Sequence, residues 1–162
     1  MYVYLLRHGD ALQLPSLNDS ERPLSELGEK QIRTAGVFLQ ACRAEIDAVY
    51  SSPLERAVQT AGIISSLLNI RKVERTEYLL PGTRKSLLLD FVNSNSPKSV
   101  LLAGHEPHLS QTLSLLISGR EDLQIEIKKG SLASVVASDP LRGGHAMLQW
   151  LLSYEQMEAL HH

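Results

Sequence analysis

Short apolar runs alternate with segments of helical periodicity along this chain, and that alternation limits its fold more than any other feature. Apolar runs at residues 2–6 and 99–103 are typical of strands buried on both faces. Between such runs, apolar side chains recur at helical spacing, which predicts amphipathic helices that pack on a sheet. We therefore predict an α/β domain rather than a helical bundle or a β-sandwich.

The expected elements follow from the same periodicity and from local capping signals. Ser25 is placed to cap the first helix, and Ser52 with Pro53 resembles the start of the second. Strands are expected at residues 2–6, 48–50, 99–103, 125–127, 132–137 and 146–150. Helices are expected at residues 27–43, 52–68, 85–92 and 109–117, with an irregular segment at 72–82 and a loop at 93–97.

Length, charge and cysteine content exclude several classes of protein. The 162 residues fit one domain, predicted to span residues 1–162, and the net charge of −2 gives no overall field for nucleic acid. The single cysteine, Cys42, excludes an internal disulfide and favours a reducing, cytoplasmic location. No secretory signal or membrane span is expected. His161 and His162 are either native or the remnant of an expression tag, and we assign them no role in the mechanism.

Polar residues follow three of the predicted strands directly, at residues 7–9, 51–56 and 104–106. Ligands of open α/β sheets bind beyond the carboxyl ends of the parallel strands, so adjacent strands would bring these clusters to one rim. The sequence thus predicts one site that contains two arginines and two histidines.

Such a site suits a phosphoryl group. Guanidinium groups match phosphate oxygens bidentately, and flanking cations keep a histidine neutral and nucleophilic. Covalent phosphohistidine chemistry is consistent with this composition. A metal site at His105, Glu106 and His108 is disfavoured, because the arginines would repel a cation. We predict neither a metal nor another cofactor.

Several motifs together carry a resemblance to a known family. Residues 6–11 (Leu-Arg-His-Gly-Asp-Ala), 22–28, 51–61 and Gly104-His105 resemble the histidine phosphatase superfamily, also called phosphoglycerate-mutase-like. The small size, the Arg-Pro-Leu-Ser segment and residues 130–134 are similar to its SixA-type phosphohistidine phosphatases. The resemblance implies a three-layer α/β/α fold with a mostly parallel central sheet flanked by helices.

Carried over residue by residue, the resemblance also implies roles for the site. His8 would take the phosphoryl group, Arg7 and Arg56 would hold its oxygens, and His105 would stabilise the group during transfer. Arg22 matches an arginine of the SixA-like pattern and would close the phosphate pocket. These five residues form the predicted catalytic and phosphate-binding set.

The proton donor and the substrate are less constrained by the sequence. Family members that release an alkoxide carry an acidic residue in a central insertion, and Glu77 is the candidate in the short segment 76–82. The short segment favours a leaving group such as imidazole, hence phosphohistidine in a protein such as a histidine-containing phosphotransfer domain. The alternatives are a small phosphorylated metabolite, or phosphate binding without turnover. No nucleic-acid or membrane partner is expected, and the sequence does not predict the oligomeric state.

Overall fold

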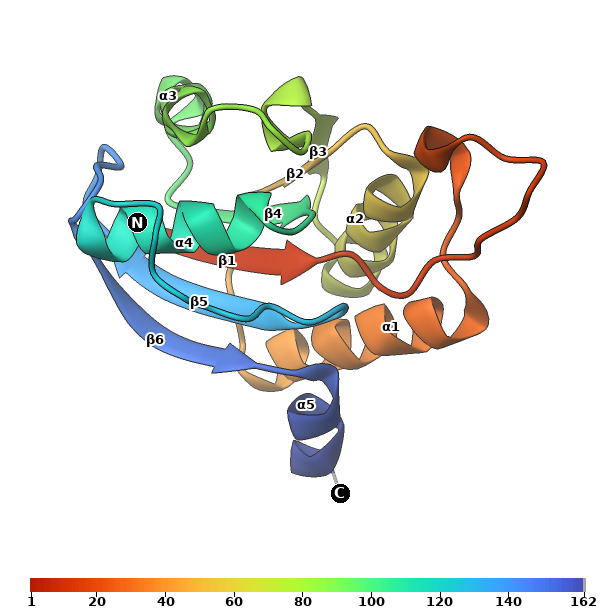
Figure 1. Cartoon of the computed structure of the whole chain (residues 1–162). Helices are drawn as coiled ribbons and strands as arrows, with labels where there is room; N and C mark the ends of the chain where they lie inside the picture. The colour runs from red at the N-terminus through yellow and green to blue at the C-terminus, as the bar shows by residue number, and fades with distance from the viewer. Residues whose placement is uncertain (162) are drawn as a thin grey trace.

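The computed structural model describes residues 1–161 and centres on a six-stranded sheet in the order β3-β2-β4-β1-β5-β6 (Figure 1). The first four strands of that order are parallel to one another. β5 pairs antiparallel with β1, and the edge strand β6 pairs antiparallel with β5. The strands are β1 (Tyr2–Arg7), β2 (Ala48–Ser51), β3 (Lys72–Arg75), β4 (Ser99–Gly104), β5 (Leu132–Ala137) and β6 (Ala146–Leu152).

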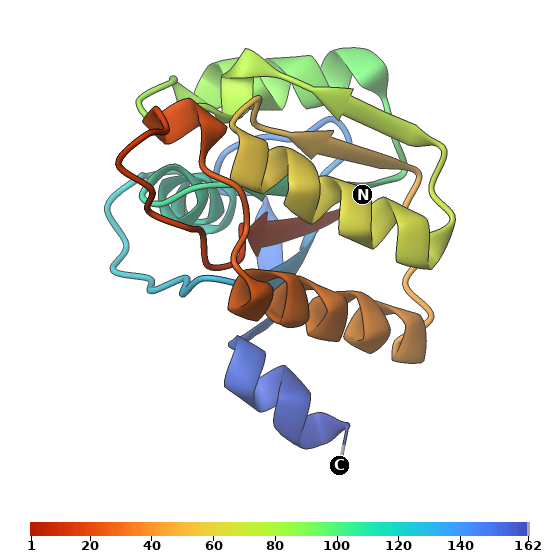
Figure 2. The same ribbon diagram turned by 90° about the vertical axis from the view of Figure 1, so that its right-hand side faces the viewer.

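Helices cover both faces of this sheet, which confirms the predicted three-layer α/β/α class (Figures 1 and 2). One apolar cluster joins the sheet to α3 and α4, and a second joins it to α1, α2 and α5. The two central strands β1 and β4 are buried by both layers, as expected of inner parallel strands. The helices are α1 (Glu26–Ala41), α2 (Glu55–Leu68), α3 (Lys85–Asn95), α4 (His108–Ser118) and α5 (Tyr154–Leu160).

Several local predictions were wrong. Residues 72–75 form the edge strand β3 and residues 77–79 a short 3-10 helix, η2, where irregular chain was expected. Residues 125–127 are not a strand, and the helix α5 follows the last strand. The short apolar segment 125–127 gains no ladder partner, whereas β3 gains one from β2. Pairing across the sheet therefore outweighs local composition at these positions.

The start of α2 also differs from the prediction. This helix begins at Glu55 with Leu54 as its cap residue, so Ser52 does not cap it. The Ser52 hydroxyl oxygen instead accepts the backbone N–H of Leu54 at 3.2 Å, in a turn that precedes the helix. Because α2 begins at Glu55, the Ser52 side chain is available for a contact with the residue that follows the neighbouring strand β4.

The loop between β1 and α1 lies close to the carboxyl end of β1, which faces the viewer in Figure 2. Within it lies a second short 3-10 helix, η1 (Asp19–Glu21). A Cβ on Gly9 would lie 2.5 Å from the carbonyl oxygen of Gly28, and one on Gly28 would lie 2.0 Å from that of Asp10. Only glycine permits this approach, so the two motif glycines fix the loop against α1.

Each helix of residues 1–161 is too short or too polar to span a lipid bilayer.

Candidate active site

The carboxyl ends of β1 and β4 bring the two predicted histidines together. Arg7 of β1 pairs with Gly104 of β4 in the parallel ladder, and the residue that follows each of these strands is a histidine. The backbone N–H of His8 donates to the Gly104 carbonyl at 3.0 Å, and the imidazole centroids of His8 and His105 lie 5.0 Å apart. The predicted convergence of polar residues at this rim is what the strand register produces.

The His8 side chain is held in one tautomer. Its Nδ1 lies 2.7 Å from the carbonyl oxygen of Gly9, which can only accept a hydrogen bond, so Nδ1 carries the ring hydrogen. Its Nε2 accepts a hydrogen bond from Arg56 Nε at 3.3 Å. The Nε2 lone pair is therefore free of hydrogen and faces a guanidinium group.

Both histidines are neutral at ordinary pH. Burial lowers the pKa of His8 to about 4; the hydrogen bond to the Gly9 carbonyl acts to raise it, and the nearby charges of Arg56, Arg7 and Lys129 act to lower it. Burial likewise lowers the pKa of His105 to about 3, with smaller contributions from His8 and Arg56. A neutral imidazole with an unprotonated nitrogen is the form that attacks phosphorus.

The hydroxyl of Ser52, which was predicted to cap α2, holds the side chain of His105. His105 Nε2 lies 2.7 Å from Ser52 Oγ, and both side chains are buried. Since Ser52 Oγ accepts the Leu54 N–H, its own hydrogen is available for Nε2, and in that tautomer the ring hydrogen of His105 is on Nδ1. His105 Nδ1 is buried and has no hydrogen-bond partner within residues 1–161. A donor of this kind is available to a bound anion.

Replacing Ser52 by alanine is expected to lower kcat about fivefold, because the imidazole of His105 loses a net hydrogen bond on the order of 1 kcal/mol. The fold is expected to persist, since the change removes one oxygen atom. Steady-state kinetics on a phosphorylated substrate measure the effect. Ser51→Ala is the matched control, because Ser51 is equally buried at the end of β2. An unchanged kcat in Ser52→Ala would show that this hydroxyl does not position His105.

Arg56 is fixed from two sides. Beyond the contact of its Nε with His8, its Nη1 donates to the Asp19 carbonyl oxygen at 2.8 Å and its Nη2 to Asp19 Oδ2 at 3.2 Å. Arg22 donates to the other carboxylate oxygen, Asp19 Oδ1, at 3.1 Å, and to the carbonyl of Leu12 at 2.9 Å. Asp19 thus links the two arginines, and Arg22 reaches the site through this carboxylate.

Arg7 lies at the end of β1 with one side of its guanidinium anchored. Its Nη1 donates to the carbonyl of Ile127 at 2.9 Å, whereas its Nε is buried and has no partner. Together with His105 Nδ1, this gives two buried nitrogens at the site that have no hydrogen-bond partner among the described residues. A tetrahedral oxyanion bound beside the neutral imidazole of His8 would accept hydrogen bonds from these two nitrogens.

The remaining residues of the α2 motif tie the loop to this site rather than facing it. Thr60 Oγ1 accepts the backbone N–H of Gly9 at 3.4 Å, and Gln59 Oε1 accepts that of Leu24 at 2.7 Å. The Gln-Thr pair of the motif therefore holds the first and last parts of the β1–α1 loop against α2.

Glu77 is not brought into contact with these residues. It opens η2 as an exposed side chain, and the described part of the chain gives its carboxylate no hydrogen bond or ion pair with His8, His105 or an arginine. Within residues 1–161, no group of three or more His, Cys, Asp or Glu side chains is arranged to hold a metal ion.

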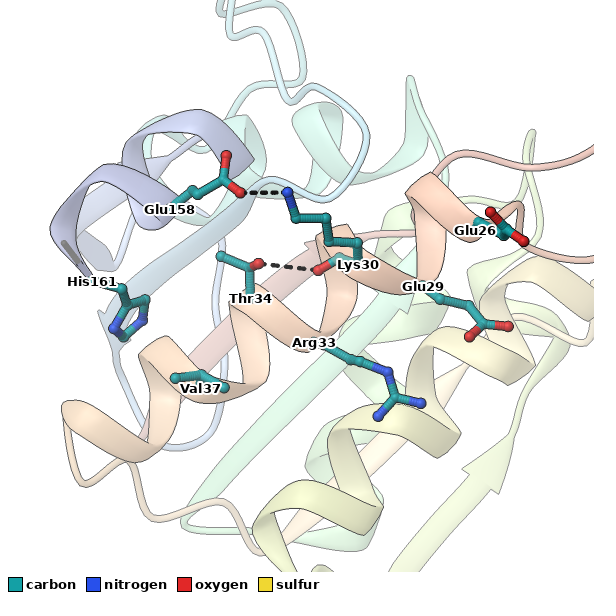
Figure 3. A pocket seen from close by; sticks show the side chains of 8 residues that line it. All are labelled: Glu26, Glu29, Lys30, Arg33, Thr34, Val37, Glu158 and His161. Atoms are coloured by element: carbon teal, nitrogen blue, oxygen red, sulfur yellow. Dashed lines mark hydrogen bonds and ion pairs between the residues drawn. The ribbon is translucent and has the colours of Figure 1, made fainter.

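A separate surface groove of about 470 Å³ lies over α1 and α5 (Figure 3). An ion pair between Lys30 Nζ and Glu158 Oε1, 2.7 Å apart, crosses it. It contains none of the residues predicted for the site. The groove is lined by Glu26, Glu29, Lys30, Arg33, Thr34, Val37, Glu158 and His161.

Three buried histidines make the stability of the fold depend on pH. The pKa values of His8 and His108 are lowered by burial to about 4, and that of His105 to about 3, from an ordinary value of 6.5. Below 6.5 the unfolded chain binds protons that the folded chain does not, so the free energy of unfolding falls as the pH falls toward about 4. Each pKa unit corresponds to about 1 kcal/mol, so the loss reaches several kcal/mol. Urea unfolding at about pH 7 and about pH 4.5 measures it, and equal free energies would contradict the prediction.

Comparison with known proteins gives the family. The histidine phosphatase superfamily (branch 1) matches residues 3–79. Phosphohistidine phosphatase SixA of Escherichia coli (strain K12) is 29% identical over 157 residues, which cover 94% of each chain. An uncharacterised protein of Mycobacterium tuberculosis (strain ATCC 25618 / H37Rv) is 30% identical over 115 residues and 70% of each chain. The structure of the protein histidine phosphatase SixA complexed with tungstate superposes with a TM-score of 0.85 at 28% identity, and covers 95% of this chain and 97% of that one.

The chain belongs to the histidine phosphatase superfamily, in its SixA-type branch, and is a phosphatase. The resemblance inferred from the motifs at residues 6–11, 22–28 and 51–61 is thereby confirmed.

Proposed function

We propose that this phosphatase removes the phosphoryl group from phosphohistidine in a protein, through a covalent phosphohistidine intermediate on His8 and without a metal ion. One observation carries the proposal. The unprotonated Nε2 of a neutral, buried His8 faces Arg56 Nε, while His105 Nδ1 and Arg7 Nε lie buried without hydrogen-bond partners. This arrangement suits a nucleophile surrounded by donors for the oxygens of a phosphoryl group.

The reaction consists of two in-line transfers. In the first, His8 Nε2 forms a bond to phosphorus as the bond from phosphorus to the leaving nitrogen breaks, and the electron pair stays with the leaving imidazole. In the second, the oxygen of water bonds to phosphorus, and the pair of the broken N–P bond returns to His8. Arg7, Arg56 and His105 stabilise the equatorial oxygens in both steps, and Arg22 supports them through Asp19.

Two observations favour phosphohistidine as the substrate. The relative from Escherichia coli is a phosphohistidine phosphatase, and its similarity extends over 94% of this chain. In the part of the chain that the structure describes, the exposed Glu77 carboxylate forms no hydrogen bond or ion pair with the site residues, and an imidazole departs more readily than an alkoxide without a donor at that position. A histidine-containing phosphotransfer domain in the cytoplasm is the partner that the sequence predicts. The bound tungstate of the SixA structure, a tetrahedral oxyanion, is consistent with an anion site in this branch.

A substrate panel tests the proposal. Phosphate release is measured in the presence of a chelator from a phosphohistidine peptide, a phosphorylated phosphotransfer domain, phosphoserine, 3-phosphoglycerate and p-nitrophenyl phosphate. We expect the highest kcat/KM on a phosphohistidine substrate. A clear preference for phosphoserine or phosphoglycerate would instead identify a phosphatase for a small metabolite. Binding of vanadate without turnover of any substrate would identify a phosphate-binding module.

A further inference from the structure

One carboxylate reaches the phosphoryl site from its solvent side. The Asp19 carboxylate accepts hydrogen bonds from Arg56 Nη2 at 3.2 Å and from Arg22 Nη1 at 3.1 Å, while Arg56 Nε donates to His8. The guanidinium of Arg56 therefore has the nucleophile at one end and Asp19 at the other. The Asp19 side chain is 66% exposed, whereas that of Arg56 is 8% exposed. Asp19 consequently lies toward solvent, on the side of Arg56 away from His8.

Two other acidic side chains near the rim, those of Asp10 and Glu106, have partners of their own. Asp10 binds Lys129 Nζ at 2.7 Å and Ser25 Oγ at 2.8 Å, and Glu106 accepts the backbone N–H of Ser110 at 2.8 Å. Within residues 1–161, Asp19 is the acidic residue that forms ion pairs with the site arginines. Hydrogen bonds from Arg22, and then from Arg56, hold the pKa of Asp19 below its ordinary value, so its carboxylate is ionised when the site is empty.

We propose that Asp19 is the catalytic base of the second step, the carboxylate that orients the water and takes its proton as phospho-His8 is hydrolysed. This inference rests on the proposed phosphohistidine intermediate. In-line displacement requires the water to approach phosphorus from the side opposite His8, which is the side that the departing group vacates toward solvent. Asp19 is exposed to solvent and bound to Arg56, and it is the carboxylate that we place on that side.

The step balances without any further reactant. The water oxygen forms a bond to phosphorus, the N–P bond breaks, and its electron pair returns to His8 Nε2. One proton of the water passes to the Asp19 carboxylate and then to bulk water, which regenerates the ionised form. Arg22 and Arg56, which already bind this carboxylate, keep it beside the phosphoryl oxygens.

Measuring the two steps separately tests the role. Wild type and Asp19→Asn are mixed with a radiolabelled phosphohistidine peptide, and rapid quenching follows acid-labile label on the enzyme and free phosphate. Because asparagine retains an acceptor for the arginines but binds a proton poorly, we expect labelling of His8 at close to the wild-type rate. Hydrolysis of phospho-His8 should slow about a hundredfold, so that labelled enzyme accumulates. Asp19→Ser should show the same accumulation.

Glu21→Gln is the matched control, because Glu21 is an exposed carboxylate of the same 3-10 helix, and within residues 1–161 its side chain accepts a hydrogen bond from the backbone N–H of Asn18 and none from a site arginine. We expect both of its steps to match wild type. If Asp19→Asn slows labelling and hydrolysis equally, Asp19 acts only by holding the arginines; if hydrolysis is unchanged, it is not the base. Either result overturns the inference. Wild-type enzyme that releases phosphate without acquiring label would instead refute the intermediate itself.

Discussion

Replacing His8 by alanine is expected to lower phosphate release by at least about 10⁴-fold, because the variant lacks the proposed nucleophile of both steps. The oxyanion site should survive, since Arg7, Arg56 and His105 are anchored by Ile127, Asp19 and Ser52 rather than by the His8 ring alone. Phosphate release with chelator present measures the activity, and vanadate binding followed by calorimetry reports the integrity of the site.

His145→Ala is the control for the loss of an imidazole, because His145 is exposed and lies between β5 and β6, outside the site. Its activity should equal that of wild type. Residual turnover by His8→Ala within about tenfold of wild type would exclude His8 as the nucleophile and, with it, the two-step mechanism.

Arg56→Lys is expected to reduce kcat/KM by about 10²–10³-fold while the charge is retained. A lysine has one ammonium group and cannot place one donor on His8 Nε2 and two others on Asp19, as the guanidinium does. The loss should include weaker binding of vanadate, because the orientation of the donor, not its charge alone, completes the anion site. Steady-state kinetics and vanadate inhibition measure the two effects.

Arg33→Lys provides the comparison, since Arg33 is an exposed arginine of α1 that lies in the groove of Figure 3 and, within residues 1–161, forms no hydrogen bond or ion pair with a site residue. No change is expected there. If Arg56→Lys retained kcat/KM within about threefold of wild type, a simple positive charge would suffice and the proposed geometric role would be wrong.

The positions of the four central site residues follow from the sequence by one physical rule. Arg7, His8 and His105 come directly after apolar runs that form parallel strands, and Arg56 lies in the helix that follows a third strand. Parallel neighbours end at the same edge, so the residues after them meet there. The outcome depends on strand direction, which the connecting helices strongly constrain.

Asp19 and Ser52 were missed for the opposite reason. Asp19 meets Arg56 across 37 positions of sequence, through a loop with no periodic pattern, and Ser52 meets His105 across 53. The sequence around Ser52 matches a helix cap well, and only the later start of α2 releases its hydroxyl for His105. Local patterns report local hydrogen bonds, so contacts of this kind are not visible in them.

The sequence by itself determined the α/β class, the succession of buried strands and amphipathic helices, and the motifs that name the family, because these depend on side-chain periodicity and short-range geometry. The tertiary structure decided the strand order β3-β2-β4-β1-β5-β6, the edge strand β3, and the carboxylate link between Arg22 and Arg56. These features arise from pairing and packing between segments far apart in the chain, where the energy of one contact depends on the placement of all the others.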